Sequence, residues 1–550
     1  MLSLQQVYYQ LESMSQISYD SEATAVVSGL LPYQGEWTHQ QAAHLLRRAC
    51  FGPTREEIAE VENMGMNAAV DNLFAAIPLP GPPVNHFFTG DSNVPIGATW
   101  VDQPFRDDVD VGQYRWGSLR GWLYDSIQEG GMNLREKMMT FWNNHFGMAD
   151  VGDHRVQYQY VTLFREQATG NFKNLVRDVT INPSMLRFLN GEYSNRWAPN
   201  ENYARELLEL FTIGKGPLVG DGDYTNYTED DVAQMARVLT GWRNRNMWST
   251  NPDIPHSYFD SNWHDPEPKV LSHRFDNVEI TNGNETEFET LLDIIFAKEE
   301  VSRFICRKLY RYFVYYKIDD TVEAQIIEPL AQIFRDNDFE MEPVLSTLFR
   351  SQHFYDSVRA GDVIKNPMEF VLGIVRPLRW GRDNFPLQLR YDSGRAMHWW
   401  IIQLGMDFFY PPSVSGWPAW HLSPSFNRLW LNSSTLQQRT SLTNSIGWSG
   451  IWVDGTGRPF DWFAFIATID RAYDPNVLVE EVAKTFFSQP LYQTQLDELK
   501  DFLIPGLPDF EWTDEYGAYL GGDQSVATSV ENKLKALFRA LFRMAEFHLN

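Results

Sequence analysis

One stretch of sequence indicates how this chain folds: Asn200-Glu201-Asn202-Tyr203-Ala204-Arg205-Glu206-Leu207-Leu208-Glu209-Leu210-Phe211-Thr212-Ile213-Gly214. At 3.6 residues per turn an apolar stripe falls on one face of a helix, made of Ala204, Leu207, Leu208 and Phe211. Asn202, Glu206 and Glu209 share the neighbouring face at spacings i, i+4 and i+7. The stretch therefore predicts an amphipathic helix whose polar residues border a buried core.

The charges on this helix have two interpretations. Glu201–Arg205 and Arg205–Glu209 are i, i+4 pairs of opposite charge, so a purely structural ladder is one of them. Glu206 has no cation four residues away on either side. Because a carboxylate that loses water needs a partner, we expect Glu206 to be mostly buried, within reach of Arg205, a histidine or an arginine from another helix. On this second interpretation the helix carries a functional site.

Helix start signals recur along the rest of the chain. Capping boxes are predicted at Thr38-His39-Gln40-Gln41, Thr54-Arg55-Glu56-Glu57 and Thr228-Glu229-Asp230-Asp231. Further helices are expected over roughly 286–297, 299–317, 322–336, 340–351 and 364–378. The pattern predicts a mainly α fold: a single large helical domain with long irregular loops and at most short β-pairs.

Two loops and three parts are expected within this fold. Prolines and glycines interrupt residues 77–110, and residues 245–285 are rich in Asn, Asp, Pro and aromatic side chains, so any strands are expected in these loops. We divide the chain into three parts. Residues 1–37 form an N-terminal extension, residues 38–440 form a helical core, and residues 441–550 form a C-terminal helical segment packed on that core.

Composition excludes several classes of protein. The chain has 550 residues, is 43% hydrophobic and carries a net charge of −26, which argues against a nucleic-acid partner. No run of 18 uncharged apolar residues predicts a membrane span, and the start, Met1-Leu2-Ser3-Leu4, lacks the basic and apolar regions of a signal peptide. The two cysteines, Cys50 and Cys306, lie in apolar helical contexts, so we expect them to be reduced and apart.

Histidines supply the other candidate groups. His264 and Asp265 lie in a loop with Lys269 close behind, where they could act as a general base with its carboxylate, bind a metal, or form a structural turn. His145 falls on the apolar face of a predicted helix, which favours a hydrogen-bonded core histidine. The sequence contains no Walker loop, no dinucleotide glycine fingerprint and no His-Glu-x-x-His. No nucleotide or flavin motif is present, so the cofactor stays unknown, with a divalent metal as one option.

Several ordered motifs resemble the bacterial family called domain of unknown function 1800. They are His44-Leu45-Leu46-Arg47-Arg48-Ala49-Cys50-Phe51-Gly52, Trp142-Asn143-Asn144-His145-Phe146, Asn182-Pro183-Ser184-Met185-Leu186, Asn202 to Leu210, Tyr224 to Trp242, His264-Asp265 with Lys269, and Pro411-Pro412 through Gly416-Trp417-Pro418. The resemblance implies an often exported, and so extracytoplasmic, helical protein. Genes of this family often neighbour those of a sulfatase-like family, domain of unknown function 1501, which makes such a protein a candidate partner.

Two functions of different class follow. In the first, the protein is a hydrolase or metal-dependent enzyme whose catalytic residues are Glu206, Glu209, Arg205, His264 and Asp265. Substrate contacts are then assigned to Asn202, Lys269 and Trp242, and His145 could join the cleft. In the second, the protein is a non-catalytic extracytoplasmic binding or assembly component, and the polar helix only fixes the packing.

Overall fold

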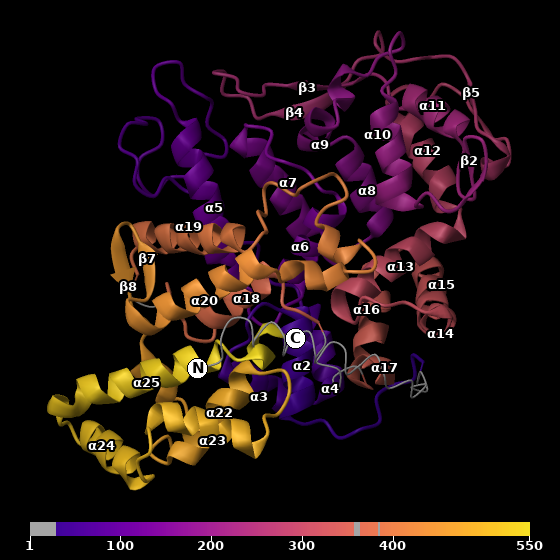
Figure 1. Cartoon of the computed structure of the whole chain (residues 1–550). Coiled ribbons are helices and arrows are strands. Elements are labelled where there is room, and N and C mark those ends of the chain that lie inside the picture. Colours follow the sequence, from indigo (N-terminus) through magenta and orange to yellow (C-terminus); the bar gives the residue numbers. More distant parts are fainter. Residues whose placement is uncertain (1–28, 357–362, 383–384) are drawn as a thin grey trace.

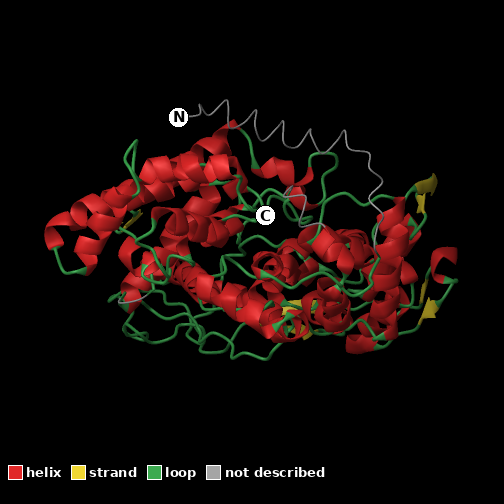
Figure 2. Ribbon diagram, turned by 90° about the horizontal axis from the view of Figure 1, so that it is seen from below, coloured by secondary structure: helices red, strands yellow, loops and turns green. Residues whose placement is uncertain are grey.

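The structure is a computed structural model of the chain, and it describes residues 29–356, 363–382 and 385–550. Helices dominate this part, and the strands form short pairs toward its edges (Figure 2). The predicted mainly α-helical single domain is confirmed. Most of the predicted N-terminal extension lies outside the described residues. None of the described helices combines the length and the apolar composition that crossing a membrane requires.

The first half of the chain is built mostly of helices (Figure 1). In chain order they are α2 (His39–Ala49), α3 (Arg55–Met64), α4 (Met66–Leu73), α5 (Gly112–Gln128), α6 (Arg135–His145), α7 (His154–Glu166), α8 (Phe172–Thr180), α9 (Pro183–Phe188), α10 (Glu201–Glu206), the π-helix η2 (Leu207–Thr212), α11 (Glu229–Val238) and α12 (Glu287–Phe296).

The second half continues in the same way. Its helices are α13 (Glu299–Phe313), α14 (Asp320–Val322), the π-helix η5 (Glu323–Ile327), α15 (Glu328–Asp336), α16 (Met341–Arg350), α17 (Gln352–Asp356), α18 (Pro367–Val375), α19 (Leu387–Gln403), α20 (Ser433–Trp448), α21 (Trp462–Ile466), α22 (Pro475–Phe486), α23 (Gln493–Leu503), α24 (Phe510–Leu520) and α25 (Ala527–Leu541). The five helices predicted between residues 286 and 378 are all present, within a few residues at each end.

Four antiparallel pairs of strands accompany the helices. They are β1 (Leu218–Gly220) with β2 (Asp223–Tyr224), β3 (Trp242–Arg245) with β4 (His256–Phe259), β5 (Lys269–Val270) with β6 (Glu279–Ile280), and β7 (Ile451–Val453) with β8 (Thr456–Arg458). The second and third pairs fall in or beside the loop at 245–285, as expected. The first and last lie outside both predicted loops, so that prediction was wrong for them. Each closes a tight turn, at Gly222 and Gly455, where φ is positive.

Helix α6 runs through the middle of the molecule and positions much of what surrounds it (Figure 1). Its residues are buried on every face. A helix buried all round must pair its charges, and here Glu136 pairs with Arg165 and Lys137 with Glu369. This packing fixes the C-terminal end of the helix, where His145 lies.

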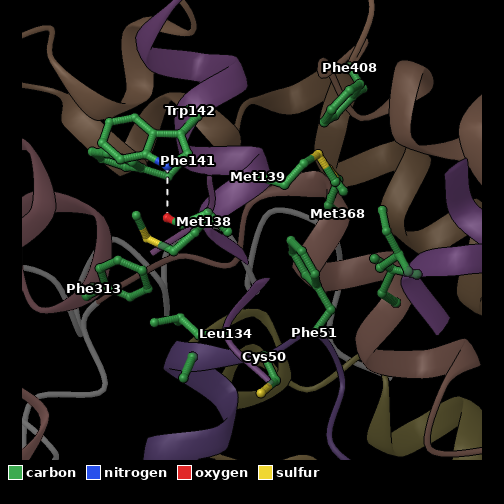
Figure 3. Close-up of a cluster of buried hydrophobic side chains, with 14 of the residues drawn as sticks. Cys50, Phe51, Leu134, Met138, Met139, Phe141, Trp142, Phe313, Met368 and Phe408 are labelled. Atoms are coloured by element: carbon green, nitrogen blue, oxygen red, sulfur yellow. Dashed lines mark hydrogen bonds between the residues drawn. The ribbon is translucent and has the colours of Figure 1, made fainter. Parts of the chain in front are cut away.

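The cysteines belong to the hydrophobic core. Figure 3 shows Cys50 in one buried cluster with Leu134, Met138 and Trp142. Cys50 and Cys306 are both buried free thiols, as predicted. Burial raises the pKa of the Cys50 thiol to about 12, so it stays protonated at neutral pH.

The C-terminal helices α22 to α25 gather at one end of the molecule (Figure 1). α25 packs against both α20 and α23. The predicted boundary between residues 440 and 441 falls inside α20, and the division of the chain into three parts stays a prediction.

Candidate functional site

The predicted polar helix changes its geometry halfway along. Asn200 caps α10 by accepting a hydrogen bond from the backbone N–H of Asn202, and the chain then continues as the π-helix η2. π-Helical turns inside α-helices often occur at functional sites. The last turn of any helix leaves carbonyl oxygens without partners in the helix. In η2 two of them, on Leu210 and Phe211, accept hydrogen bonds from side chains of other helices.

His145 connects its own helix, α6, to the π-helix η2. Its Nε2 lies 3.0 Å from the carbonyl oxygen of Phe211, which can only accept, so we assign the ring proton to Nε2. Nδ1 is then an acceptor, and it lies 3.0 Å from Nζ of Lys308. Burial, followed by the charge of Lys308, holds the pKa of His145 well below its usual value. The imidazole is therefore neutral, as the prediction of a hydrogen-bonded core histidine requires.

Lys308 of α13 donates to two acceptors at once. Besides His145, it donates to the carbonyl oxygen of Leu210 at 2.9 Å, and its Nζ lies 4.6 Å from the centre of the Phe304 ring. In the described part of the chain no carboxylate lies within 4.0 Å of this amine. Burial, and then the nearby Arg311, lower the pKa of Lys308 to about 7.

A cavity of about 200 Å³ opens between α6, η2, α13 and the segment around residue 420. In the same measure a single water needs roughly 10–15 Å³, so a small organic ligand fits. Its polar lining comes from Asn144, His145, Glu209, Arg307, Lys308, Arg311, Ser415 and His421. Its apolar lining comes mainly from aromatic rings, those of Phe141, Phe304, Tyr312 and Trp420.

The two arginines of this lining are not equivalent. Arg307 is held by Glu300 and Glu323, at 2.6 and 2.5 Å. Arg311 has no carboxylate within 4.0 Å among the described residues, and its Nε is buried without a hydrogen bond. Burial and then Arg307 lower the pKa of Arg311, and the pKa of His421 is lowered by burial and then by Lys308 and Arg311. The cavity is thus locally cationic in a protein whose net charge is −26.

Of the residues predicted on the polar helix, Glu209 reaches this cavity. Its carboxylate accepts from the hydroxyl of Tyr227 at 3.1 Å and lies 3.5 Å from Nζ of Lys215. Glu206 is only partly buried and has no direct hydrogen bond or ion pair among the described residues, which is less than we expected. Burial and then Glu209 raise the pKa of Glu206.

Arg205 and Asn202 of that helix do not line the cavity. Arg205 pairs with Glu229 of α11 through two hydrogen bonds of 2.8 and 2.7 Å, and more loosely with Glu201. The expected Arg205–Glu209 pair is replaced by this contact, because α11 packs directly against α10. Asn202 is exposed. These contacts tie two helices together.

His264, Asp265 and Lys269 form a separate buried network. The carboxylate of Glu287 lies 3.0 Å from Nε2 of His264 and 2.5 Å from Nζ of Lys269, and all three side chains are at most 1% exposed. Asp265 pairs with Arg237. These residues do not line the cavity with Glu209, so the predicted single cleft is not formed. Their sealed geometry supports the structural-turn interpretation.

Two further expectations concern Trp242 and a metal. Trp242 packs edge-on against Phe259 and Phe288 and does not line the cavity. Across residues 29–356, 363–382 and 385–550, no three His, Cys, Asp or Glu side chains are grouped closely enough to hold a metal ion.

Sequence reasoning missed Lys308, Arg311 and His421. A signal for two of them was present, because neither Lys308 nor Arg311 has an acidic residue three or four positions away on its helix. Unpaired cations on an otherwise well-paired amphipathic helix indicate a contact outside the helix.

The fold and the cavity define a mainly α-helical protein with a cationic internal site. The model of the family described as "Protein of unknown function (DUF1800)" matches residues 44–548. The chain therefore belongs to the DUF1800 family. Comparison with curated proteins and with solved structures finds no match.

Proposed function

We propose that the cavity binds a small ligand, or the end of a larger one, that carries a carboxylate, sulfate or phosphate group. The observation that carries this proposal is the unpaired guanidinium of Arg311 at the cavity wall, with Nε buried and unsatisfied. A buried cation without a counter-charge is costly, and a bound anion removes that cost. Lys308 and His421 line the same cavity and add further donors.

The aromatic lining restricts the rest of the ligand. Tyr312 and Trp420 lie with their ring centres 5.5 Å apart, and both line the cavity. Flat apolar faces of this kind suit a ring, such as a sugar or an aromatic group. The ligand class that fits is therefore a ring-containing or short-chain organic anion.

The lining of this cavity also suits acid–base catalysis. Within that class of enzyme we propose a hydrolase. Glu209 supplies a carboxylate and Lys308 an amine whose pKa is near 7, which suits proton transfer at neutral pH. With no group of metal ligands in the described residues, a metal-dependent reaction has less support than acid–base chemistry. The alternative is a binding component that holds the same anion without converting it.

Location and partner are also proposals, and the family resemblance is their support. An extracytoplasmic site of action is tested by fractionating cells that express the full gene. A sulfatase-like protein of the domain of unknown function 1501 family is tested as a partner by co-purification with this chain.

Thermal melts test the proposed ligand class. Sulfate, phosphate, citrate and acetate are added at constant ionic strength, which keeps charge screening constant, and the stabilisation that wild type and variants share is subtracted as the general effect of the salt. A ligand that binds only the folded state stabilises it by RT ln(1 + [L]/Kd), so wild type should melt at a higher temperature as the anion concentration rises. Arg311→Gln should lose this shift. Arg303→Gln, on the same helix but paired with Glu299 and Glu328, should keep it. Equal shifts in all three proteins would reject the cavity as an anion site.

A further inference from the structure

The amine of Lys308 has a geometry that anion binding alone does not require. We propose that Lys308 forms an imine with the carbonyl group of an anionic aldehyde or keto acid bound in the cavity. The inference rests on the proposed function, because Arg311 would hold the anionic group. It adds a covalent step and narrows the ligand to a carbonyl compound.

The hydrogen bonds of Lys308 leave its nitrogen lone pair available. A neutral amine has two N–H donors, and two acceptors are in place, the carbonyl oxygen of Leu210 and Nδ1 of His145. Neither acceptor carries a negative charge that would favour the ammonium form. Both donors are therefore satisfied without protonation, and the lone pair has no donor facing it among the described residues.

The surroundings favour the neutral amine. Arg311 lies on the same helix, one turn from Lys308, and the Phe304 ring covers one side of the Lys308 nitrogen. Removing water and placing cations nearby both disfavour a charged amine, which is how reactive lysines are activated in proteins. The pKa of Lys308, about 7, agrees with this arrangement.

Lys365 shows why the cavity matters. Lys365 is buried, whereas Lys308 is half-buried; burial lowers the pKa of Lys365 well below the usual value, and Lys365 donates to the carbonyl oxygen of Phe547. The cavity that Lys365 lines, however, has a volume of about 20 Å³, which is room for about one water. Lys308 combines a neutral amine with about ten times that space, so Lys365 serves as an internal control.

The reaction balances without any further reagent. The nitrogen lone pair attacks the carbonyl carbon, a C–N bond forms, and the carbonyl π electrons become a hydroxyl once a proton moves from nitrogen to oxygen. Loss of that hydroxyl as water gives the C=N bond. His145 Nδ1 already accepts an N–H of Lys308, so it is placed to take that proton and return it.

Reductive trapping with pyridoxal 5′-phosphate tests the proposal, because this probe carries both an aldehyde and a phosphate. The native protein is treated near pH 7, reduced with borohydride, digested and mapped by mass spectrometry. An amine with a pKa near 7 is about half neutral at that pH, whereas only about one in three thousand ordinary lysine side chains is neutral. We expect Lys308 to be labelled about tenfold or more faster than Lys365 and the exposed lysines.

Variants separate the amine from the anion site. Lys308→Arg places a permanent positive charge at this position and has no amine to form an imine, so labelling here should vanish while sulfate still stabilises the fold. Arg311→Gln should slow labelling by the phosphorylated aldehyde more than labelling by uncharged benzaldehyde, because it removes the contact to the phosphate as well as the cation that lowers the pKa of Lys308. Arg303→Gln should behave as wild type with both probes.

The outcomes are distinguishable. If Lys308 reacts no faster than Lys365 and the exposed lysines, the imine is rejected, even where sulfate still raises the melting temperature through Arg311. If Lys308 is labelled selectively and Arg311→Gln changes nothing, the reactive amine is upheld and the anion site at Arg311 is rejected. The mapping of wild type alone decides the first question, so it does not depend on any variant folding.

Discussion

Nζ of Lys308 lies 3.0 Å from Nδ1 of His145, so two side chains that are often cationic share one hydrogen bond. His145 also donates to the carbonyl oxygen of Phe211, which leaves Nδ1 only the role of acceptor. This contact joins α6 to α13 and places an amine, two arginines and a glutamate around one cavity.

The first prediction concerns pH. The folded state holds the pKa of Lys308 near 7, below its usual 10.5. Between these two values the unfolded chain binds one more proton than the folded chain, so stability rises with pH in that window. The free energy of unfolding of wild type, measured in urea relative to Lys308→Met, should therefore increase from about pH 7 towards pH 10. A difference that stays flat over this range would contradict a depressed pKa.

The second prediction tests the sealed network. Glu287→Gln removes the carboxylate that pairs with both His264 and Lys269, leaving a buried ammonium without its counter-charge. We expect a loss of about 3–5 kcal/mol in the free energy of unfolding. The matched control is Glu229→Gln, which breaks the more exposed pair with Arg205 and should cost under about 1 kcal/mol. Similar losses in both variants would show that the network is not as buried as the structure has it.

The third prediction concerns Glu206. Its pKa is raised by burial and by the neighbouring Glu209, so the folded state binds the proton more tightly than the unfolded state. As the pH rises from below 4.5 through this raised pKa, wild type should therefore lose stability relative to Glu206→Gln. At neutral pH the variant should be no less stable than wild type. Urea unfolding at several pH values measures this. A destabilised variant at neutral pH would reveal a partner for Glu206.

Much of the fold was predictable because its signals are local. Thr54 with Glu57, and Thr228 with Asp231, form the predicted capping boxes. At Thr38 only the hydrogen bond from the backbone of Gln40 forms the cap, so the box is incomplete. Such signals depend on residues a few positions apart and survive any tertiary arrangement.

The site was only partly predictable because its contacts are distant in sequence. Glu209 and His145 were recognised from helical spacing, and both line the cavity. Lys308 meets His145 across 163 residues, and no periodicity reports such a contact. His264 does not line this cavity, and its contact with Glu287 of the later helix α12 is likewise distant in sequence. The π-helix, too, has no local sequence signal that we could use.

The most direct test of the central claim is to locate an anion in the cavity. Selenate resembles sulfate and scatters anomalously, so crystals of wild type and of Arg311→Gln are soaked in it and their anomalous density is compared. We predict a peak within hydrogen-bond distance of the Arg311 guanidinium, on the side of Lys308, that is absent from the variant. A wild-type cavity without a peak, at selenate concentrations that saturate the thermal shift, would contradict the account.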